Sequence, residues 1–268
     1  MARRKTKEVW LNPCIFEWEA MVGSSIPNFA REWRRAHEIW SHAEKRLLSA
    51  LTDEDRADVV SILRRVLNHR ISRLRKLYLD KLPLLRMPSR AIEQLELVGV
   101  AKRGMVHKLL EIRNRIEYRD RKPPSTSACS ELLEFVWYFL RSTDPLVSQV
   151  VKDFEVYKHS PRGNRTAYWF MLYFGPKTKW KAKIHGWVEP ADISFTPVHG
   201  WLKVQAEMVK QLKDSEKLGL AQNVLDKELD KSEDEKLKDE DFYIAGKFDD
   251  EPSQLKFLCR FYFSNPNF

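Results

Sequence analysis

The sequence predicts an α+β fold, in which an N-terminal antiparallel helical bundle is followed by a small antiparallel β-rich domain with one helix. Apolar residues recur at helical spacing in the front half, whereas apolar and polar residues alternate after about residue 150. The type of cation changes at the same place, since 20 of the 28 Lys and Arg residues in 1–150 are Arg and 151–268 holds only three Arg. We therefore expect two domains, 1–150 and 151–268.

The front half contains helix signals of several kinds. Thr52 is a predicted N-cap, and apolar residues from Val59 to Tyr78 then follow the helical period. Proline and glycine breaks separate the other segments, with Pro123-Pro124 the strongest. The expected helices cover part of 10–50, then 52–82, a short segment from Ser89 to Gly99, 101–119 and 127–142.

The back half alternates as strands do. The apolar run 168–174 precedes a Gly-Pro turn, after which Trp180, Ala182 and Ile184 alternate with lysines, so we expect a hairpin. The remaining segments are an expected helix over 200–225, a mixed-charge helix end or loop that ends near 241, and strands near 154–157, 242–248 and 255–263. This order favours a curved sheet or a partly open barrel.

Composition restricts the class of protein. Hydrophobic residues make up 43% of the chain, so it is able to bury a core, and no apolar run has the length of a membrane span. The three cysteines are isolated and no His, Cys or carboxylate group has metal-ligand spacing, so we expect a cytoplasmic protein without metal or cofactor. The entire net charge of +9 lies in 1–150, because 151–268 holds 19 cations and 19 acids.

Arg is the residue best suited to planar, bidentate contact with phosphate. The charge distribution therefore fits nucleic acid as a partner, although Arg is also a good helix former on solvated faces. Within the front half, the polar side of the 52–82 helix is expected to carry Arg64, Arg65, Arg70, Arg73, Arg75 and Lys76. We take Arg64 and Arg65 as candidate RNA contacts.

The segment from about 55 to 142 resembles the HEPN family. The match consists of a long helix, a Leu-Val-Gly turn at 97–99, the run Leu-Leu-Glu-Ile-Arg-Asn-Arg-Ile-Glu ending at Glu117, a Pro-Pro break and a final aromatic helix. The resemblance implies an all-α bundle that pairs two copies through its Arg-Asn helices. It also implies a metal-independent ribonuclease, or an RNA-binding relative, of prokaryotic defence and toxin–antitoxin systems.

Arg113 and Asn114 match the family's signature, but Tyr118 stands where the family has a His. The ribonuclease mechanism needs a proton carrier, and the pKa of a tyrosine, about 10, is far less suited to it than that of histidine. We therefore expect a degenerate site that keeps RNA binding and homodimerisation through the helical half, with Arg115 and Arg119 as further RNA contacts. Two alternatives remain open, an active endoribonuclease that uses Arg113, Asn114 and Tyr118, and a non-catalytic structural subunit of a larger defence assembly.

The predicted hairpin offers a second basic surface. Lys179, Lys181 and Lys183 project from one face of a strand, with Trp180 on the opposite face and therefore in the core. Lysines with neighbouring aromatics suit single-stranded nucleic acid. A lysine row that protects a sheet edge from unwanted pairing is an equally good interpretation.

Overall fold

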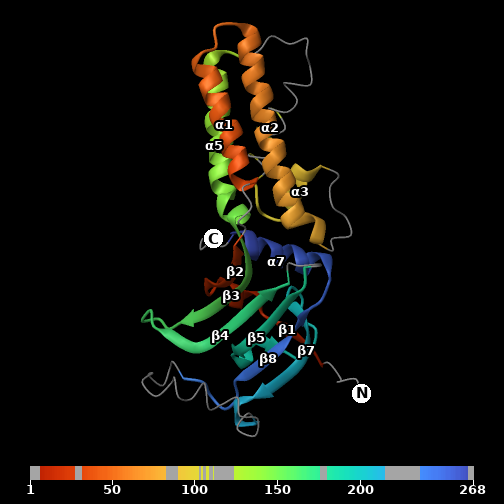
Figure 1. The fold of residues 1–268 in the computed structure, drawn as a ribbon. Helices are drawn as coiled ribbons and strands as arrows, with labels where there is room; N and C mark the ends of the chain where they lie inside the picture. The colour runs from red at the N-terminus through yellow and green to blue at the C-terminus, as the bar shows by residue number, and fades with distance from the viewer. Residues whose placement is uncertain are drawn as a thin grey trace. The chain divides into compact units, whose positions relative to one another are not determined.

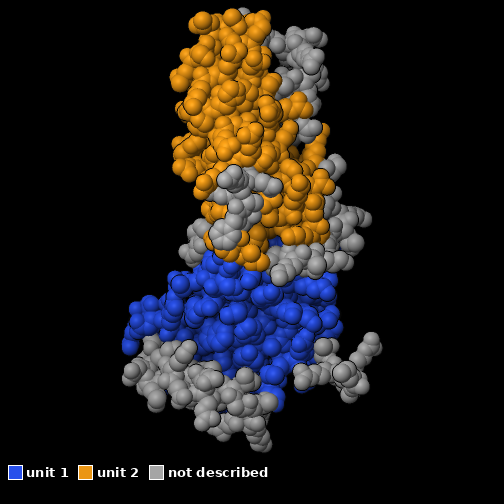
Figure 2. Space-filling model, viewed as in Figure 1, with its two compact units in different colours: residues 1–25, 151–267 blue, residues 26–150, 268 orange. Residues whose placement is uncertain are grey.

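The structure of this chain is a computed structural model. It describes residues 7–27, 32–82, 90–102, 104, 107–108, 111, 124–175, 180–214 and 236–264. The protein is mixed α+β and divides into two compact units (Figure 2). One unit comprises residues 1–25 with 151–267, and the other comprises 26–150 with residue 268.

The described residues of the first unit form an open antiparallel sheet of eight strands. Along the chain these are β1 (Lys7–Leu11), β2 (Glu19–Pro27), β3 (Gln149–His159), β4 (Arg165–Phe174), β5 (Ala182–Val188), β6 (Ile193–Ser194), β7 (Leu202–Gln211) and β8 (Phe242–Phe248). The order across the sheet is β2-β3-β4-β5-β8-β7-β1-β6, so β2 and β6 are its edges. Figure 1 shows β3, β4, β5 and β8 as neighbouring strands. A bulge between Ala206 and Met208 interrupts the pairing of β7 with β8.

The core of this unit lies between the sheet and the helix α7 (Pro252–Ser264). Phe16, from the 3₁₀ turn Pro13–Glu17, has its ring centroid 5.4 Å from Phe170 of β4 and 5.3 Å from Phe261 of α7. The Tyr262 hydroxyl donates to the Val151 carbonyl at 2.9 Å, so a buried polar group is satisfied inside an aromatic core. Gly186 is required here, because a Cβ at this position would lie 2.2 Å from the Trp169 carbonyl oxygen.

The second unit is built on three long helices, α1 (Glu32–Leu48), α2 (Asp53–Leu77) and α5 (Thr126–Ser148), with the shorter α3 (Ala91–Leu97). Buried side chains of α2 and α5 form its core, including Leu63, Leu74 and Phe139. Ala36 and Ala43 are buried one heptad apart on α1, and such small residues allow the helix to approach its neighbours closely. Helix α1 runs antiparallel to α2 and α5 (Figure 1).

Several predicted elements are confirmed. The 52–82 helix is α2, with Thr52 as its N-cap, and the 127–142 helix is α5, which continues through Pro145 to Ser148. The hairpin is formed by β4 and β5, the strand near 242–248 is β8, and Trp180 is buried in the core.

Three predicted assignments are wrong. Residues 7–27, expected in the helical domain, form β1 and β2, and the pairing of β1 with β7 and β6 joins them to the sheet unit. Residues 202–211, expected to be helical, form β7, because Leu202, Val204 and Ala206 alternate toward the core. The expected strand at 255–263 is α7, whose buried residues have helical spacing.

Most of the expected 101–119 helix lies outside the described residues, as do 215–235 of the mixed-charge region.

Candidate nucleic-acid interface

The structure describes only part of the predicted site. Six predicted site residues lie outside the described parts of the chain, namely Arg113, Asn114, Arg115, Tyr118, Arg119 and Lys179. Arg64 and Arg65 lie on α2, whereas Lys181 and Lys183 lie at and within β5. Because α2 and β5 belong to different units, the described residues form two separate candidate surfaces.

A capping box between Thr52 and Asp55 fixes the residue at which helix α2 begins. The Thr52 hydroxyl accepts from the Asp55 backbone N–H at 3.1 Å, and the Asp55 carboxylate accepts from the Thr52 N–H at 3.0 Å. This reciprocal capping box satisfies two otherwise unpaired donors of the first turn. Backbone hydrogen bonds from Thr52 and then Leu51 lower the pKa of the Asp55 carboxyl, so it stays ionised near the positive end of the helix dipole.

A basic groove lies between α1 and α2, with a volume of about 590 Å³. We call it the α1–α2 groove. The residues that line it are Arg35, Ile39, Arg65, Asn68, His69, Ser72, Arg73 and Lys76. Four of these are permanent cations, and none is acidic. Asn68 and Ser72 add neutral hydrogen-bonding groups, so the lining can contact both the charge and the oxygens of a phosphate.

The cations follow one stripe of α2. Arg65, His69 and Lys76 are separated by four and seven residues, which places them on one face of the helix. The stripe from Arg65 to Lys76 is about 16 Å long at 1.5 Å per residue. Both end residues are exposed, and neither has an ion-pair partner among the described residues. Their charge is therefore available to an anion.

Arg35 brings a cation from α1 to the same groove. Its guanidinium contacts Glu38 at 3.1 Å, and both side chains are more than half exposed. An exposed pair at i, i+3 contributes little free energy, typically a few tenths of a kcal/mol. A phosphate can therefore replace Glu38 as the partner of Arg35 at small cost. Arg64, the other predicted contact on α2, is not part of the groove lining.

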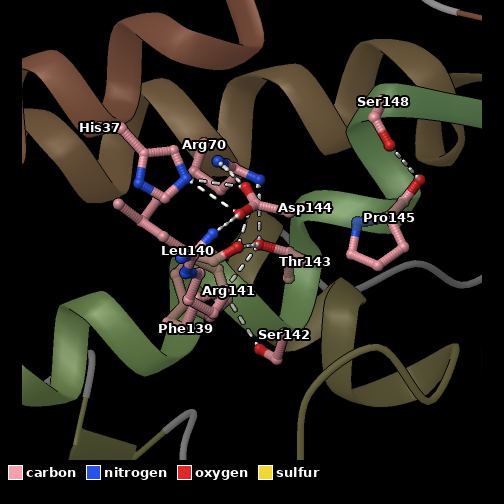
Figure 3. Close-up of polar contacts among 10 residues, drawn as sticks. All are labelled: His37, Arg70, Phe139, Leu140, Arg141, Ser142, Thr143, Asp144, Pro145 and Ser148. Carbon is pink, nitrogen blue, oxygen red and sulfur yellow. Dashed lines mark hydrogen bonds and ion pairs between the residues drawn. The ribbon is translucent and has the colours of Figure 1, made fainter.

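A buried polar cluster holds the three long helices together (Figure 3). Arg70 of α2 donates to the Asp144 carboxylate of α5 at 2.8 Å and to the Thr143 hydroxyl at 3.3 Å. His37 of α1 contacts the two oxygens of the same carboxylate at 2.9 and 3.0 Å through Nε2. Thr143 in turn donates to the Phe139 carbonyl at 2.7 Å. One carboxylate thus connects α1 and α2 to α5.

The residues of this cluster are not part of the groove lining, but the cluster positions the groove. Arg70 is only 1% exposed, and burial lowers the pKa of its guanidinium while the hydrogen bond and charge of Asp144 raise it. A guanidinium in this setting remains charged, so Arg70 supplies a permanent cation to the cluster. Because Arg70 lies on α2 and His37 on α1, the cluster fixes the two helices that form the walls of the groove.

The sequence placed Arg70 on the solvated side of its helix, and this assignment is wrong. Leu63, Leu67 and Leu74 are buried, and position 70 continues their i, i+3, i+4 spacing. The helical phase was therefore a usable signal for a buried Arg. Arg35 carried no such signal, because its place in the groove depends on the packing of α1 against α2.

No group of three His, Cys, Asp or Glu side chains that could hold a metal ion occurs in the parts of the chain that the structure describes. Among the described helices, none is long and apolar enough to cross a membrane. Comparison with known proteins found no protein-family model, no curated protein and no solved structure that matches this chain.

Proposed function

We propose that this chain is an RNA-binding module that holds the phosphate backbone of RNA in the α1–α2 groove. One observation carries the proposal, namely four permanent cations from two helices around a groove without a lining carboxylate. Such a surface neutralises phosphates and releases their counterions, independently of base sequence. Arg65, which the sequence singled out as an RNA contact, is one of the four.

The choice of RNA rests on the resemblance of residues 55–142 to the HEPN family, in which helix α2 is the first long helix of the match. We propose accordingly that the helical unit is a HEPN-like module of a prokaryotic defence system. The replacement of the family's His by Tyr118 favours binding without cleavage.

The first experiment measures binding and cleavage together. Labelled mixed-sequence RNA is incubated with the protein in EDTA, and the wild type is compared with the double variant Arg65→Gln/Lys76→Gln. Arg75→Gln is the matched control, because Arg75 is an exposed α2 residue outside the groove lining that pairs with Asp80 at 2.8 Å. We expect the double variant to lose affinity and the control to keep it. Equal affinities for all three proteins contradict the proposal.

The cleavage readout separates a binding module from an active ribonuclease. Cleavage in EDTA that disappears in Arg113→Ala establishes an active endoribonuclease, with Arg113, Asn114 and Tyr118 as its site. Without cleavage in the wild type, Tyr118→His tests whether the site is degenerate, because a degenerate site gains activity from the restored histidine. A variant that folds and binds RNA but gains nothing argues against a ribonuclease ancestry for these residues.

A second candidate function is self-association through the helical unit, favoured by an apolar groove of about 560 Å³ between α1 and α5. Its walls include Trp40, Leu48, Trp137 and Tyr138, with Leu48 85% exposed. Glu44 and Glu134 lie in the lining and the exposed Arg141 lies over the Trp137 ring, so two copies that pair through this patch can place opposite charges against each other.

The mass of the protein in solution tests this candidate. Light scattering after gel filtration should give a dimer for the wild type and a monomer for Leu48→Glu. Leu51→Glu is the matched control, because Leu51 is 90% exposed and lies outside the groove lining. A monomeric wild type, or a Leu48→Glu variant that remains dimeric, rules out pairing through this groove.

A further inference from the structure

The face of the sheet opposite α7 carries lysines in one cross-strand row and aromatic residues in another. Phe170 and Ile184 point to the core and α7, so their sequence neighbours on β4 and β5 project from the other face. One cross-strand row of that face contains Tyr173, Lys183 and Lys247, which are directly opposite one another on β4, β5 and β8. We call this face the β4–β5–β8 face.

A second row of the same face is wholly aromatic. Tyr157 is opposite Trp169, Trp169 is opposite Trp187, and Trp187 is opposite Tyr243. With neighbouring strands about 4.8 Å apart, these four side chains span about 14 Å across four strands. Between the two rows lies His185, whose ring centroid is 6.0 Å from that of Trp169. Trp187 is only 1% exposed, so the aromatic row is largely covered, and burial lowers the pKa of His185, which is therefore uncharged at neutral pH.

The lysines of β5 do not protect an edge. Strand β5 is paired on both sides, with β4 and with β8 (Figure 1). Edge protection requires unpaired backbone groups, which β5 lacks along its length. For Lys183, the position of the strand therefore removes the edge-protection interpretation that the sequence left open.

The lysines of this face also lower the stability of the sheet. Lys183 is directly opposite Lys247, and like charges at opposite positions destabilise a strand pair. Lys247 is compensated by Glu207 at 2.8 Å. Lys181 and Lys183 are exposed and have no carboxylate partner among the described residues. A bound anion would supply the missing compensation.

We propose that the β4–β5–β8 face binds single-stranded nucleic acid, with phosphates on Lys181 and Lys183 and a base stacked on Tyr173. This inference deepens the proposed function, because it names unpaired strands as the form of RNA that the chain prefers. Tyr173 is 38% exposed and directly opposite Lys183, so a stacking ring and a phosphate contact lie side by side. Stacking needs a free base face, which a duplex hides. An acidic protein segment would meet the lysines but would not use the ring.

The test measures fluorescence anisotropy with a labelled uridine 12-mer, an abasic 12-mer and an RNA hairpin duplex. Tyr173→Ala should weaken binding of the uridine strand by about 5- to 160-fold, the range found for one stacked base, and Tyr173→Phe should restore it. Neither change should alter binding of the abasic strand. Lys181→Gln/Lys183→Gln should weaken both strands, whereas Lys213→Gln, an exposed lysine outside this face, should weaken neither.

The outcomes separate this inference from the α1–α2 groove. If Tyr173→Ala binds every probe as the wild type does, the stacking surface is refuted, whether or not Arg65→Gln/Lys76→Gln loses affinity. If only the sheet variants lose affinity, the groove proposal fails and the sheet inference stands. If poly-glutamate displaces the 12-mer and binds with equal affinity to wild type and Tyr173→Ala, the face is a site for acidic protein and the inference is overturned. Absence of binding to any RNA refutes both.

Discussion

The salt dependence of RNA binding gives the most direct test of the α1–α2 groove. Each phosphate contact on a single strand contributes about −0.7 to the slope of log affinity against log salt. Arg65 and Lys76 therefore predict a contribution of about −1.4 between them, which Arg65→Gln/Lys76→Gln should remove. Between about 50 and about 200 mM salt, this contribution alone corresponds to a loss of about 7-fold in affinity.

Anisotropy titrations of one labelled RNA at four salt concentrations measure these slopes. The difference of about 1.4 between wild type and variant is the quantity to compare, because cations elsewhere on the protein add equally to both slopes. Arg75→Gln should keep the wild-type slope, since its loss removes one positive charge without removing a groove contact. Equal slopes for wild type and double variant refute the groove as the phosphate site, even if the double variant binds more weakly.

Three further predictions concern the framework. Arg70→Met removes the buried cation that faces Asp144, although His37 and Arg141 still contact this carboxylate, so it should lower the free energy of unfolding by up to about 3 kcal/mol in urea titrations followed by circular dichroism, and Arg70→Met/Asp144→Leu should recover part of the loss. A double variant no better than the single one contradicts this account. Thr52→Ala removes the N-cap of α2 and should cost about 1 kcal/mol in the same titration, whereas Thr52→Ser should cost much less. Burial raises the pKa of the Asp241 carboxyl, so this carboxyl keeps its proton to a higher pH in the folded protein than in the unfolded chain. Ionisation of Asp241 at neutral pH therefore lowers the stability of the folded protein. Stability from this group therefore rises as the pH falls through the folded pKa, and Asp241→Asn should be more stable than wild type at neutral pH, with a smaller gain on acidification. An Asp241→Asn variant that unfolds earlier at neutral pH shows that the carboxylate's hydrogen bonds outweigh its burial.

The long helices could be predicted because their signals are local. The capping box at Thr52 and the apolar spacing that follows it lie within a few turns of α2. Short elements could not be assigned in the same way. Strand β7 is rich in Lys, Gln and Glu, which favour helices, and its strand form depends on pairing with β8 about forty residues later. The aromatic residues of helix α7 also alternate with other residues, so its 13 residues fit both the period of a strand and the period of a helix.

The candidate surfaces were predictable in part for the same reason. Alternation in the sequence was sufficient to place Lys181 and Lys183 on one face and Trp180 on the other. The same pattern could not show whether their strand is an edge strand or a central strand. Strand β8, which pairs with the side of β5 away from β4, begins only at Phe242, far along the chain from β5. The groove likewise could not be predicted from the sequence, because it forms only where α1 packs on α2. The Arg-rich side of α2 itself could be predicted from the helical spacing of its residues.

The two surfaces lie on different units, and their energetic coupling decides whether they serve one strand of RNA. If one strand contacts both, the free-energy losses of the groove and Tyr173 variants should add for a long RNA, because distant contacts to one ligand contribute independently. A long RNA should then bind more tightly than either surface binds a short one, through effective concentration. If the surfaces bind separate molecules, a long RNA should show two binding events, each sensitive to one variant only. The combined variant Arg65→Gln/Lys76→Gln/Tyr173→Ala, titrated with a 12-mer and with a strand several times longer, distinguishes the two arrangements.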